Sequence, residues 1–311
     1  MIRLEQVTKR YGSVQALRGI SLQVHKGEVL GLLGQNGAGK TTLLNILTGY
    51  LAPTEGNVLV GGYDPLLNAR EAKRRLGYLP EHPPLYDEMT VREYLAFAAE
   101  LKGVQRRAVP AHVDEVMELT GLTEMRSRLL GHLSKGYRQR TGFAQAICGD
   151  PEILVLDEPT VGLDPKQINE IRQLIRSLAS GRTIIFSSHI LSEVQQLCSH
   201  VVILHQGQVK LDSPMERLGQ SDEVTLRIRA AGQQSALLSQ VRQLDGVYRA
   251  EPQPAPGGDV CEMLITFHGV DEPERRLFAM MSHLGQPILH LSRQGGSLEQ
   301  IFLDAISGDG C

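Results

Sequence analysis

The sequence has no long apolar run. A membrane-spanning helix needs about 18 or more consecutive apolar residues, whereas the apolar stretches at 153–156 and 201–204 are no longer than one strand. The first residues, MIRLEQVTKRYG, also lack the apolar core of a secretory signal. These absences predict a cytoplasmic chain that reaches a membrane only through a partner protein.

Cysteine is scarce and shows no pattern. The four cysteines, Cys148, Cys198, Cys261 and Cys311, have no C-x-x-C spacing. Such spacing is typical of metal sites, and conserved-looking sets of cysteines in short secreted chains indicate disulfides. We therefore interpret the cysteines as buried or free thiols, and a disulfide or a metal site is the less favoured alternative.

Positive charge is not in excess either. The chain carries 32 Lys and Arg against 35 Asp and Glu, which gives a net charge of −3 at pH 7. Proteins that bind nucleic acids without sequence preference neutralise phosphates with many Lys and Arg side chains. The charge balance predicts no nucleic-acid partner and leaves room only for a local basic patch.

No lysine follows Lys210, so the charged residues of the C-terminal part differ from those of the preceding part. From residue 219 onward, seven arginines stand against twelve acidic residues. A chain of 311 residues also exceeds the usual size of one hydrophobic core. We therefore predict a large domain over residues 1–218 and a small one over residues 219–311, with the boundary near 213–223.

The first domain shows the pattern of an α/β fold. The apolar stretches VLGLLG, ILVLDEP and TIIFSSH end in glycine, acidic or polar residues, and helical sequence follows each of them. Buried parallel strands whose carboxyl ends carry a site have this pattern. Between about residues 82 and 147 the sequence becomes mostly helical, with a capping box at Thr90 and Glu93. This predicts a helical subdomain inserted into the α/β core.

The second domain reads as strand, helix, two strands, helix and strand, followed by a last helix. The βαββαβ order predicts a small ferredoxin-like α+β domain. It contains no group of His, Cys or paired carboxylates with recognisable site spacing. We therefore expect this domain to contribute to dimerisation or regulation and not to catalysis.

The segment GQNGAGKTT fits the phosphate-loop pattern G-x-x-x-x-G-K-[ST]. It follows the apolar stretch EVLGLLG and precedes TLLNILTG, and this strand–loop–helix context supports a nucleotide site. Backbone N–H groups of the loop would bind phosphate oxygens, Lys40 would contact the β and γ phosphates, and the Thr41 hydroxyl would bind Mg²⁺. The residues of this loop are Gly34, Gln35, Asn36, Gly37, Ala38, Gly39, Lys40, Thr41 and Thr42.

The stretch ILVLDEP supplies the acidic residues that a phosphate-loop enzyme needs. Asp157 ends the apolar stretch and Glu158 follows it. One carboxylate binds Mg²⁺ through water, and the next is placed to orient or deprotonate an attacking water. Beside a phosphate loop, this interpretation is favoured over a strand that merely ends in a solvated acidic pair.

A third feature is LSKGYRQR, in which Ser134 is a good residue to cap a helix. Together with Tyr11, the phosphate loop, ILVLDEP, GLDP and SSH in this order, it resembles the ATP-binding subunit of ABC transporters over residues 1–218. The resemblance implies a P-loop NTPase fold with a mostly parallel sheet, an antiparallel N-terminal β subdomain and a helical insert. It implies ATP and Mg²⁺ as cofactors.

The resemblance also assigns roles to individual residues. It implies that Ser134 and Gly136 close over the γ-phosphate held by a second copy of the chain, which predicts a head-to-tail homodimer. Tyr11 stands where the family stacks an aromatic ring on adenine. Asp164 lies in the loop that crosses the dimer interface, and His189 stands where a histidine contacts the γ-phosphate and the attacking water. In the same comparison Thr42 lies beside the α-phosphate.

Two positions depart from the family pattern. Glu81 stands where most members have a glutamine that contacts Mg²⁺ and water, and Tyr137 stands where the common signature has glutamine. A carboxylate still binds a metal, but it adds negative charge near the γ-phosphate. We expect ATP binding and dimer closure to survive both changes.

The function implied is ATP hydrolysis that drives export through a separate integral membrane permease. The second domain resembles the C-terminal regions of some ABC-2-type exporter ATPases, including those of gliding motility and of multidrug or natural-product efflux. A groove around residues 81–101 is the expected docking place of a cytoplasmic permease helix. An ABC ATPase that works as a mechanical switch in a cell-envelope complex is the alternative. An ATPase acting on DNA or ribosomes is disfavoured, because the chain has no long coiled-coil insertion and no second ATPase unit.

Overall fold

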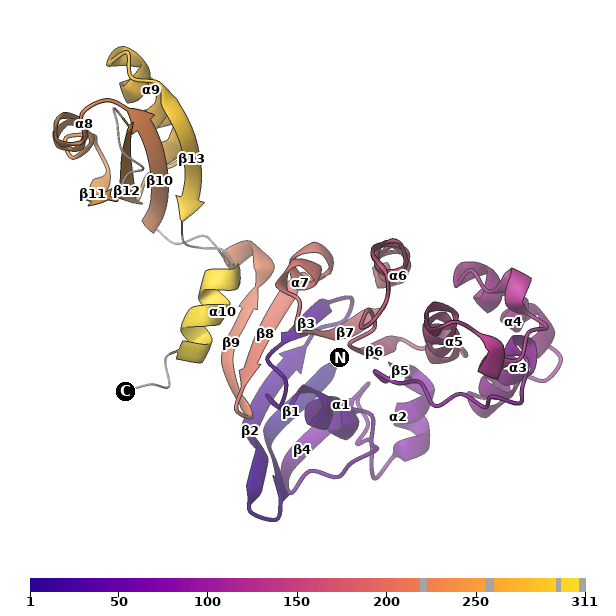
Figure 1. Cartoon of the computed structure of the whole chain (residues 1–311). Coiled ribbons are helices and arrows are strands. Elements are labelled where there is room, and N and C mark those ends of the chain that lie inside the picture. The colour runs from indigo at the N-terminus through magenta and orange to yellow at the C-terminus, as the bar shows by residue number, and fades with distance from the viewer. Residues whose placement is uncertain (219–222, 255–259, 295–297, 308–311) are drawn as a thin grey trace. The chain divides into compact units, whose positions relative to one another are not determined.

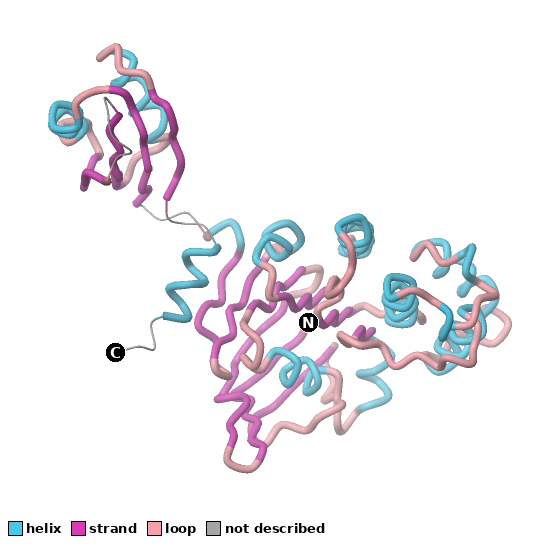
Figure 2. Tube along the Cα trace, viewed as in Figure 1, coloured by secondary structure: helices cyan, strands magenta, loops and turns pink. Residues whose placement is uncertain are grey.

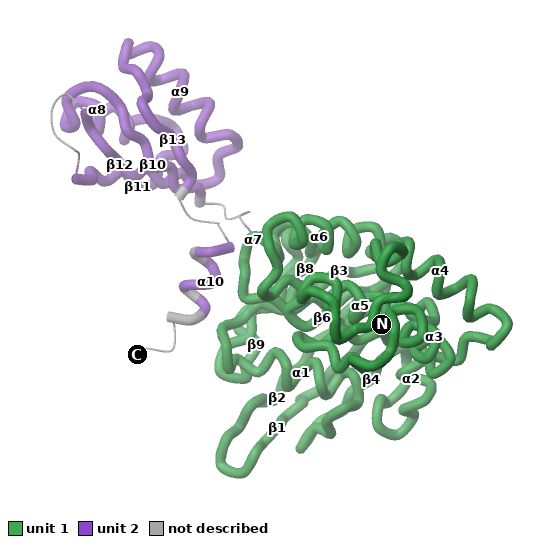
Figure 3. Tube along the Cα trace, turned by 45° about the vertical axis from the view of Figure 1, so that its right-hand side comes forward, with its two compact units in different colours: residues 1–215 green, residues 216–311 purple. Residues whose placement is uncertain are grey.

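Tertiary contacts divide the chain into two compact units, Met1–Met215 and Glu216–Cys311 (Figure 3). The computed structural model describes residues 1–218, 223–254, 260–294 and 298–307. Each unit has its own buried apolar cluster, so each is described by itself. Within these described ranges, no helix is long and apolar enough to cross a membrane.

The first unit contains a six-stranded sheet with the strand order β5-β6-β7-β3-β8-β9 (Figure 1). Neighbouring strands pair in parallel, except that β9 runs antiparallel to β8. β3, β6 and β7 are buried along their whole length, as parallel strands covered on both faces must be. The strands are β3 (Val29–Leu33), β5 (Leu76–Leu79), β6 (Ile153–Asp157), β7 (Thr183–Ser188), β8 (His200–His205) and β9 (Gln208–Pro214).

A smaller antiparallel sheet with the order β2-β1-β4 forms the predicted N-terminal β subdomain. β1 (Ile2–Tyr11) pairs with β2 (Val14–Val24) on one side and with β4 (Glu55–Val60) on the other. Apolar residues of these strands join one buried cluster with α1 (Lys40–Leu47) and the six-stranded sheet. Because α1 packs against both sheets, the position of the loop that precedes it is fixed.

The helical insert gathers α3 (Val91–Leu101), α4 (Val109–Leu119) and α5 (Lys135–Ile147) in one region (Figure 2). The predicted capping box is present, since Glu93 N donates to the Thr90 hydroxyl and Thr90 N donates to the Glu93 carboxylate at 2.8 Å. α5 lies so close to β5 that a Cβ at Gly77 would be 1.9 Å from the carbonyl oxygen of Ala146. Backbone contact with the sheet therefore anchors the insert.

The remaining helices of the first unit contact different elements: α2 (Ala69–Arg75) contacts β5, α6 (Pro165–Ala179) contacts α7 (Leu191–Leu197), and α7 contacts β3 and β7. The 3-10 turns are η1 (Thr123–Met125), η2 (Leu130–His132) and, at the border of the two units, η3 (Met215–Arg217). α6 begins directly after the loop that carries Asp164, and α7 begins directly after His189.

The second unit is an antiparallel four-stranded sheet with the order β11-β12-β10-β13. Its first and third strands are central, which is the arrangement of the predicted ferredoxin-like sandwich. The apolar residues of one sheet face pack with α8 and α9 into a separate core. The elements are β10 (Glu223–Ala231), α8 (Gln234–Val241), β11 (Val247–Gln253), β12 (Val260–His268), α9 (Pro273–His283), β13 (Ile288–Gln294) and the last helix α10 (Leu298–Ser307). The predicted turn PQPAPGGD falls partly outside the described residues.

Candidate active site

The loop between β3 and α1 has the backbone of an anion-binding turn. Gly37 and Gly39 have φ values of 80° and 106°, in the left-handed region that favours glycine. No side chain caps the start of α1, and no acidic residue lies in its first turn. The first N–H groups of α1 and the positive end of its dipole are thus available to an anion.

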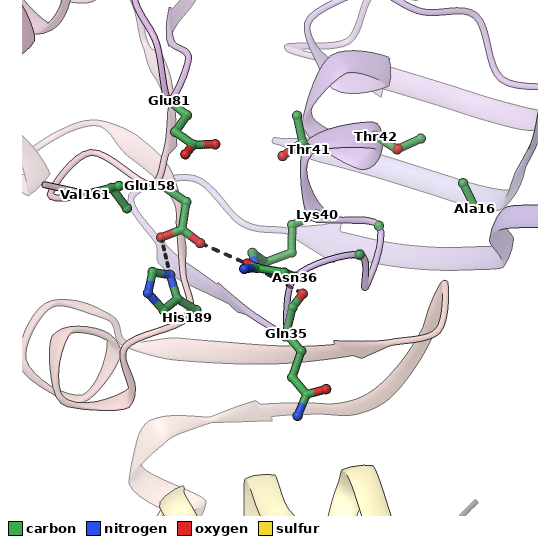
Figure 4. A pocket seen from close by; sticks show the side chains of 12 residues that line it. Ala16, Gln35, Asn36, Lys40, Thr41, Thr42, Glu81, Glu158, Val161 and His189 are labelled. Atoms are coloured by element: carbon green, nitrogen blue, oxygen red, sulfur yellow. Dashed lines mark hydrogen bonds and ion pairs between the residues drawn. The ribbon is translucent and has the colours of Figure 1, made fainter.

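Lys40 lies at the start of α1 with its ammonium group inside the site. Its side chain is only 7% exposed. The Nζ atom donates to the carbonyl oxygen of Gly34 at 2.6 Å and lies 3.4 Å from Oε1 of Glu158 (Figure 4). The lysine therefore connects the phosphate loop with the acidic end of β6.

Glu158 follows β6 and contacts both other predicted catalytic residues. Its Oε1 atom faces Lys40, and its Oε2 atom lies 2.9 Å from Nδ1 of His189. Glu158 is 7% exposed and has φ 47°, an uncommon backbone conformation for a residue with a side chain. The structure therefore brings Glu158, His189 and Lys40 together in one row (Figure 4).

Asp157 is buried at the end of β6, with one carboxylate oxygen bonded and the other without a partner. Ser187 donates its hydroxyl to Oδ1 at 2.6 Å, and Oδ2 has no hydrogen-bond partner among the described residues. Burial raises the pKa of Asp157, although hydrogen bonds from Ser187 and Thr41 oppose this effect. The nearby charges of Glu158 and Glu81 raise the pKa further.

This donor set fits Mg²⁺. A magnesium ion prefers oxygen ligands and in nucleotide sites needs only one or two from the protein, because water and phosphates supply the others. The free oxygen of Asp157 and the Thr41 hydroxyl meet that need, and the Glu81 carboxylate lies on the same side of the site (Figure 4). No group of three or more His, Cys, Asp or Glu in the described part of the chain could hold a metal unaided.

A cavity of 340 Å³ opens between the phosphate loop and these carboxylates. Ala16 and Val161 line it beside the predicted residues, and neither was singled out from the sequence. The predicted residues that line it are Gln35, Asn36, Gly37, Gly39, Lys40, Thr41, Thr42, Glu81, Glu158 and His189. Gly34 and Ala38 belong to the same loop but do not line the cavity.

Four predicted residues lie away from this cavity. Tyr11 ends β1, is 48% exposed and has Lys9 Nζ 5.3 Å from its ring centre. Ser134 is exposed and is the N-cap residue of α5, as predicted, and its side chain makes no capping hydrogen bond. Gly136 is buried against Gln167, and Asp164 accepts a hydrogen bond from the backbone of Gln167 at 2.9 Å.

Ser187 is a site residue that the sequence did not point to. Its hydroxyl donates to Asp157 and accepts from the backbone N–H of Glu158 at 2.9 Å. Ser187 is the first serine of the SSH motif. Its contact with Asp157 could be recognised only from the pairing of β6 with β7, which places the two residues opposite each other.

The fold and the site define a class of protein. The ABC transporter family model matches residues 17–161, and the chain belongs to this family as an ATP-binding subunit. The resemblance inferred from the motifs is therefore confirmed.

Individual relatives extend the match over nearly the whole chain. The bacitracin transport ATP-binding protein BcrA of Bacillus licheniformis is 34% identical over 323 residues, covering 99% of this chain and 98% of BcrA. The ABC transporter ATP-binding protein NatA of Bacillus subtilis (strain 168) is 39% identical over 228 residues, covering 71% of this chain and 93% of NatA.

Solved structures agree in fold. The ATP-binding subunit of an ABC transporter superposes with a TM-score of 0.65 at 29% identity, covering 70% of this chain and 91% of the other. The ATP-binding cassette MJ0796, solved as a dimer in a post-hydrolysis state with ADP and Pi, gives a TM-score of 0.64 at 26% identity. That match covers 69% of this chain and 98% of MJ0796.

Replacing Ser187 with alanine removes the hydroxyl that holds Asp157 and the backbone of Glu158. A hydrogen bond to a charged group contributes about 1.5–3 kcal/mol, so the Mg²⁺ concentration for half-maximal ATP hydrolysis should rise roughly tenfold or more. Titrating Mg²⁺ at saturating ATP measures this. Ser177→Ala is the matched control, because its hydroxyl donates to the Leu174 carbonyl within α6. An unchanged Mg²⁺ dependence in Ser187→Ala would contradict the assignment.

Proposed function

We propose that this chain hydrolyses MgATP in the 340 Å³ cavity and thereby drives export through a separate membrane protein. The observation that carries the proposal is the row formed by Lys40, Glu158 and His189 beside the phosphate loop. This row places a cation, a carboxylate and an imidazole around one small space. Phosphoryl transfer needs such positioning and charge stabilisation.

The phosphate loop and Lys40 bind the phosphates of ATP. The loop N–H groups and the dipole of α1 contact phosphate oxygens, and the Lys40 ammonium lies within reach of the β and γ phosphates. Mg²⁺ would be held by Thr41 and Asp157, with Glu81 nearby, and it would neutralise charge on the phosphates. Tyr11 is assigned to the adenine ring, which its exposed position permits.

Glu158 acts on the attacking water. The water oxygen bonds to the γ-phosphorus and its proton passes to the Glu158 carboxylate, while the bond from the γ-phosphorus to the β–γ bridging oxygen breaks. ADP and phosphate are the products. Nδ1 of His189 lies 2.9 Å from Oε2 of Glu158, and in the tautomer that carries a proton on Nδ1 it donates a hydrogen bond that fixes the carboxylate in place.

A second copy of the chain completes the site. Ser134 and Gly136 lie away from the cavity, at the start of a helix whose first turn has neither a side-chain cap nor an acidic residue. An uncapped helix start favours an anion. We assign it to the γ-phosphate bound by the other copy, with Asp164 in the loop between the two sites. The MJ0796 structure is dimeric, which supports the pairing of two copies.

A groove between the helical insert and residues 48–78 is assigned to an integral membrane permease. It has a volume of 720 Å³ and combines aromatic side chains, among them Tyr50, Tyr86 and Phe97, with a basic rim. The Tyr86 and Phe97 ring centres lie 5.9 Å apart. Exposed aromatic residues are typical of protein interfaces. A short permease helix with apolar and acidic residues fits this groove, and it would hold the chain at the cytoplasmic face of the membrane.

The cargo is assigned by class only. Besides BcrA, the linearmycin resistance ATP-binding protein LnrL of Bacillus subtilis (strain 168) is 34% identical over 250 residues, covering 78% of this chain and 79% of LnrL. Both names concern antibiotics, which supports export and not uptake as the direction of transport. All the residues that line the ATP cavity belong to the first unit, so we assign the second unit to dimerisation or regulation.

The Glu158→Gln variant tests the catalytic assignment. Glutamine keeps the shape of the side chain but cannot accept the proton, so the turnover number should fall about 10²-fold or more. ATP binding should persist, and ATP should trap a dimer detectable by size-exclusion chromatography with light scattering. Glu152→Gln is the control, since Glu152 pairs with Arg75 at the surface. Full ATPase activity in Glu158→Gln would refute the assignment.

The Ser134→Trp variant tests the composite site. A large side chain at the exposed start of α5 should block closure of the dimer while the cavity of each copy stays intact. We expect ATP affinity in the dilute monomer to change less than about threefold, within the range of surface substitutions, and turnover to be abolished. Fluorescent ATP binding and phosphate release measure the two quantities. Ser134→Ala, which keeps the backbone donors, should retain most activity, and a Ser134→Trp variant with normal turnover would exclude the dimeric site.

The Phe97→Arg variant tests the groove. Arginine removes the aromatic ring and places a cation where apolar residues of the permease helix would pack, and the loss of such an interface contact costs about 2 kcal/mol or more. Co-purification with the permease should fall, while ATPase activity of the isolated subunit stays normal. Leu119→Arg is the control, because Leu119 is 46% exposed at the end of α4 and does not line the groove. Equal co-purification of both variants would show that the permease binds elsewhere.

A further inference from the structure

Glu193 of α7 is a fully buried carboxylate that has no part in the proposed hydrolysis. Its exposed fraction is 0%. A buried glutamate is expensive unless it is paired and hydrogen-bonded, because its charge is removed from water. Its partners therefore show what this charge holds in place.

The Oε2 atom of Glu193 joins two hydroxyl groups from different parts of the chain. Thr160 donates to it at 2.9 Å and Ser188 donates to it at 2.9 Å. Thr160 and Ser188 are themselves buried. Both hydroxyls thus donate a hydrogen bond to one carboxylate oxygen, which links the two segments through a single buried charge.

The Oε1 atom of Glu193 faces α6. Arg172 places its guanidinium 3.5 Å from this oxygen. The Arg172 side chain is 17% exposed, and its Nε atom is buried without a hydrogen-bond partner among the described residues. A partly buried cation thus balances the charge of Glu193 and ties it to the helix that follows Asp164.

The two hydroxyl partners stand next to the catalytic residues in sequence. Thr160 is the second residue after Glu158, and Ser188 immediately precedes His189. The Ser188 hydroxyl also accepts from the backbone N–H of Ile190 at 3.0 Å, so the chain is held on both sides of His189. Glu158 itself has the strained φ of 47°, which persists only where its surroundings hold it.

We propose that Glu193 is a positioning residue for hydrolysis. It holds the loop after Glu158 and the end of β7 before His189 in the positions that bring the Glu158 and His189 side chains together. This inference rests on the proposed function. Glu193 does not contact the phosphates, and the cavity lining does not include it. It acts through Thr160 and Ser188 on the distance between the Glu158 carboxylate and the His189 imidazole.

The Glu193→Gln variant tests this positioning. The amide keeps the size of the side chain but replaces one acceptor oxygen with an NH2 donor. Either Arg172 loses its partner, or both hydroxyls lose the oxygen that they share. A displacement of about 1 Å in a catalytic group costs roughly 10²-fold in rate, so we expect the turnover number to fall between about 10-fold and 100-fold. The dissociation constant of ATP and the melting temperature should stay close to those of the wild type.

The matched control is Glu262→Gln in the second unit. Glu262 is also a buried glutamate, 3% exposed, it pairs with Arg227 and Arg229, and the lining of the ATP cavity includes none of these three residues. It should leave the turnover number unchanged. Thr160→Val repeats the test from the other side of the contact, since it removes one hydroxyl at nearly constant volume.

A double-mutant cycle separates positioning from general stability. His189→Ala should lower turnover strongly in the wild-type background and only slightly in Glu193→Gln, because both changes disrupt the same arrangement. Additive losses, an unchanged turnover number in Glu193→Gln, or a loss that is matched by equal weakening of ATP binding would each overturn the inference. Absence of ATPase activity in the wild-type protein would instead refute the proposed function.

Discussion

The pairing of β6 with β7 decides the chemistry of the site. Its parallel register places Asp157 opposite Ser187. The ends of the two strands therefore bring Asp157, Glu158, Ser187, Ser188 and His189 to one edge of the sheet. Successive residues of a strand point to opposite faces, so a shift by one residue would turn the carboxylate of Asp157, which we propose binds Mg²⁺, away from the phosphate loop. The apolar burial of these two strands fixes the register, and the catalytic contacts depend on it.

The residues that sequence reasoning found share one property. The phosphate loop and the Asp157–Glu158 pair are short, contiguous motifs whose chemistry is determined by neighbours along the chain. Local spacing was therefore enough to predict that Lys40 and Glu158 belong to one site, and their atoms lie 3.4 Å apart. The ferredoxin-like unit was predictable for a related reason, since its chain order and alternating strands leave few arrangements.

The residues that sequence reasoning missed depend on contacts between distant segments. Ser187 donates a hydrogen bond to Asp157 on the neighbouring strand β6. Glu193 accepts hydrogen bonds from Thr160 and Ser188, which lie 28 positions apart in the sequence. A single sequence does not state which strands are neighbours, so the partners of these side chains could not be read from it. The roles proposed for Ser134 and Asp164 depend on contacts with a second copy of the chain. No reading of one chain's geometry supplies those contacts.

The order of the strands has a consequence for how the protein forms during synthesis. β3, which leads into the phosphate loop, lies between β7 and β8, although about half of the chain's length separates them in sequence. Such long-range pairing is slow to form, and a nascent chain emerges from its N-terminus. The backbone of Leu204 in β8 lies against Gly34 of the phosphate loop. The loop therefore gains this neighbour only after β8 has been synthesised, and a chain truncated before β8 would carry the motif without the strand that supports it.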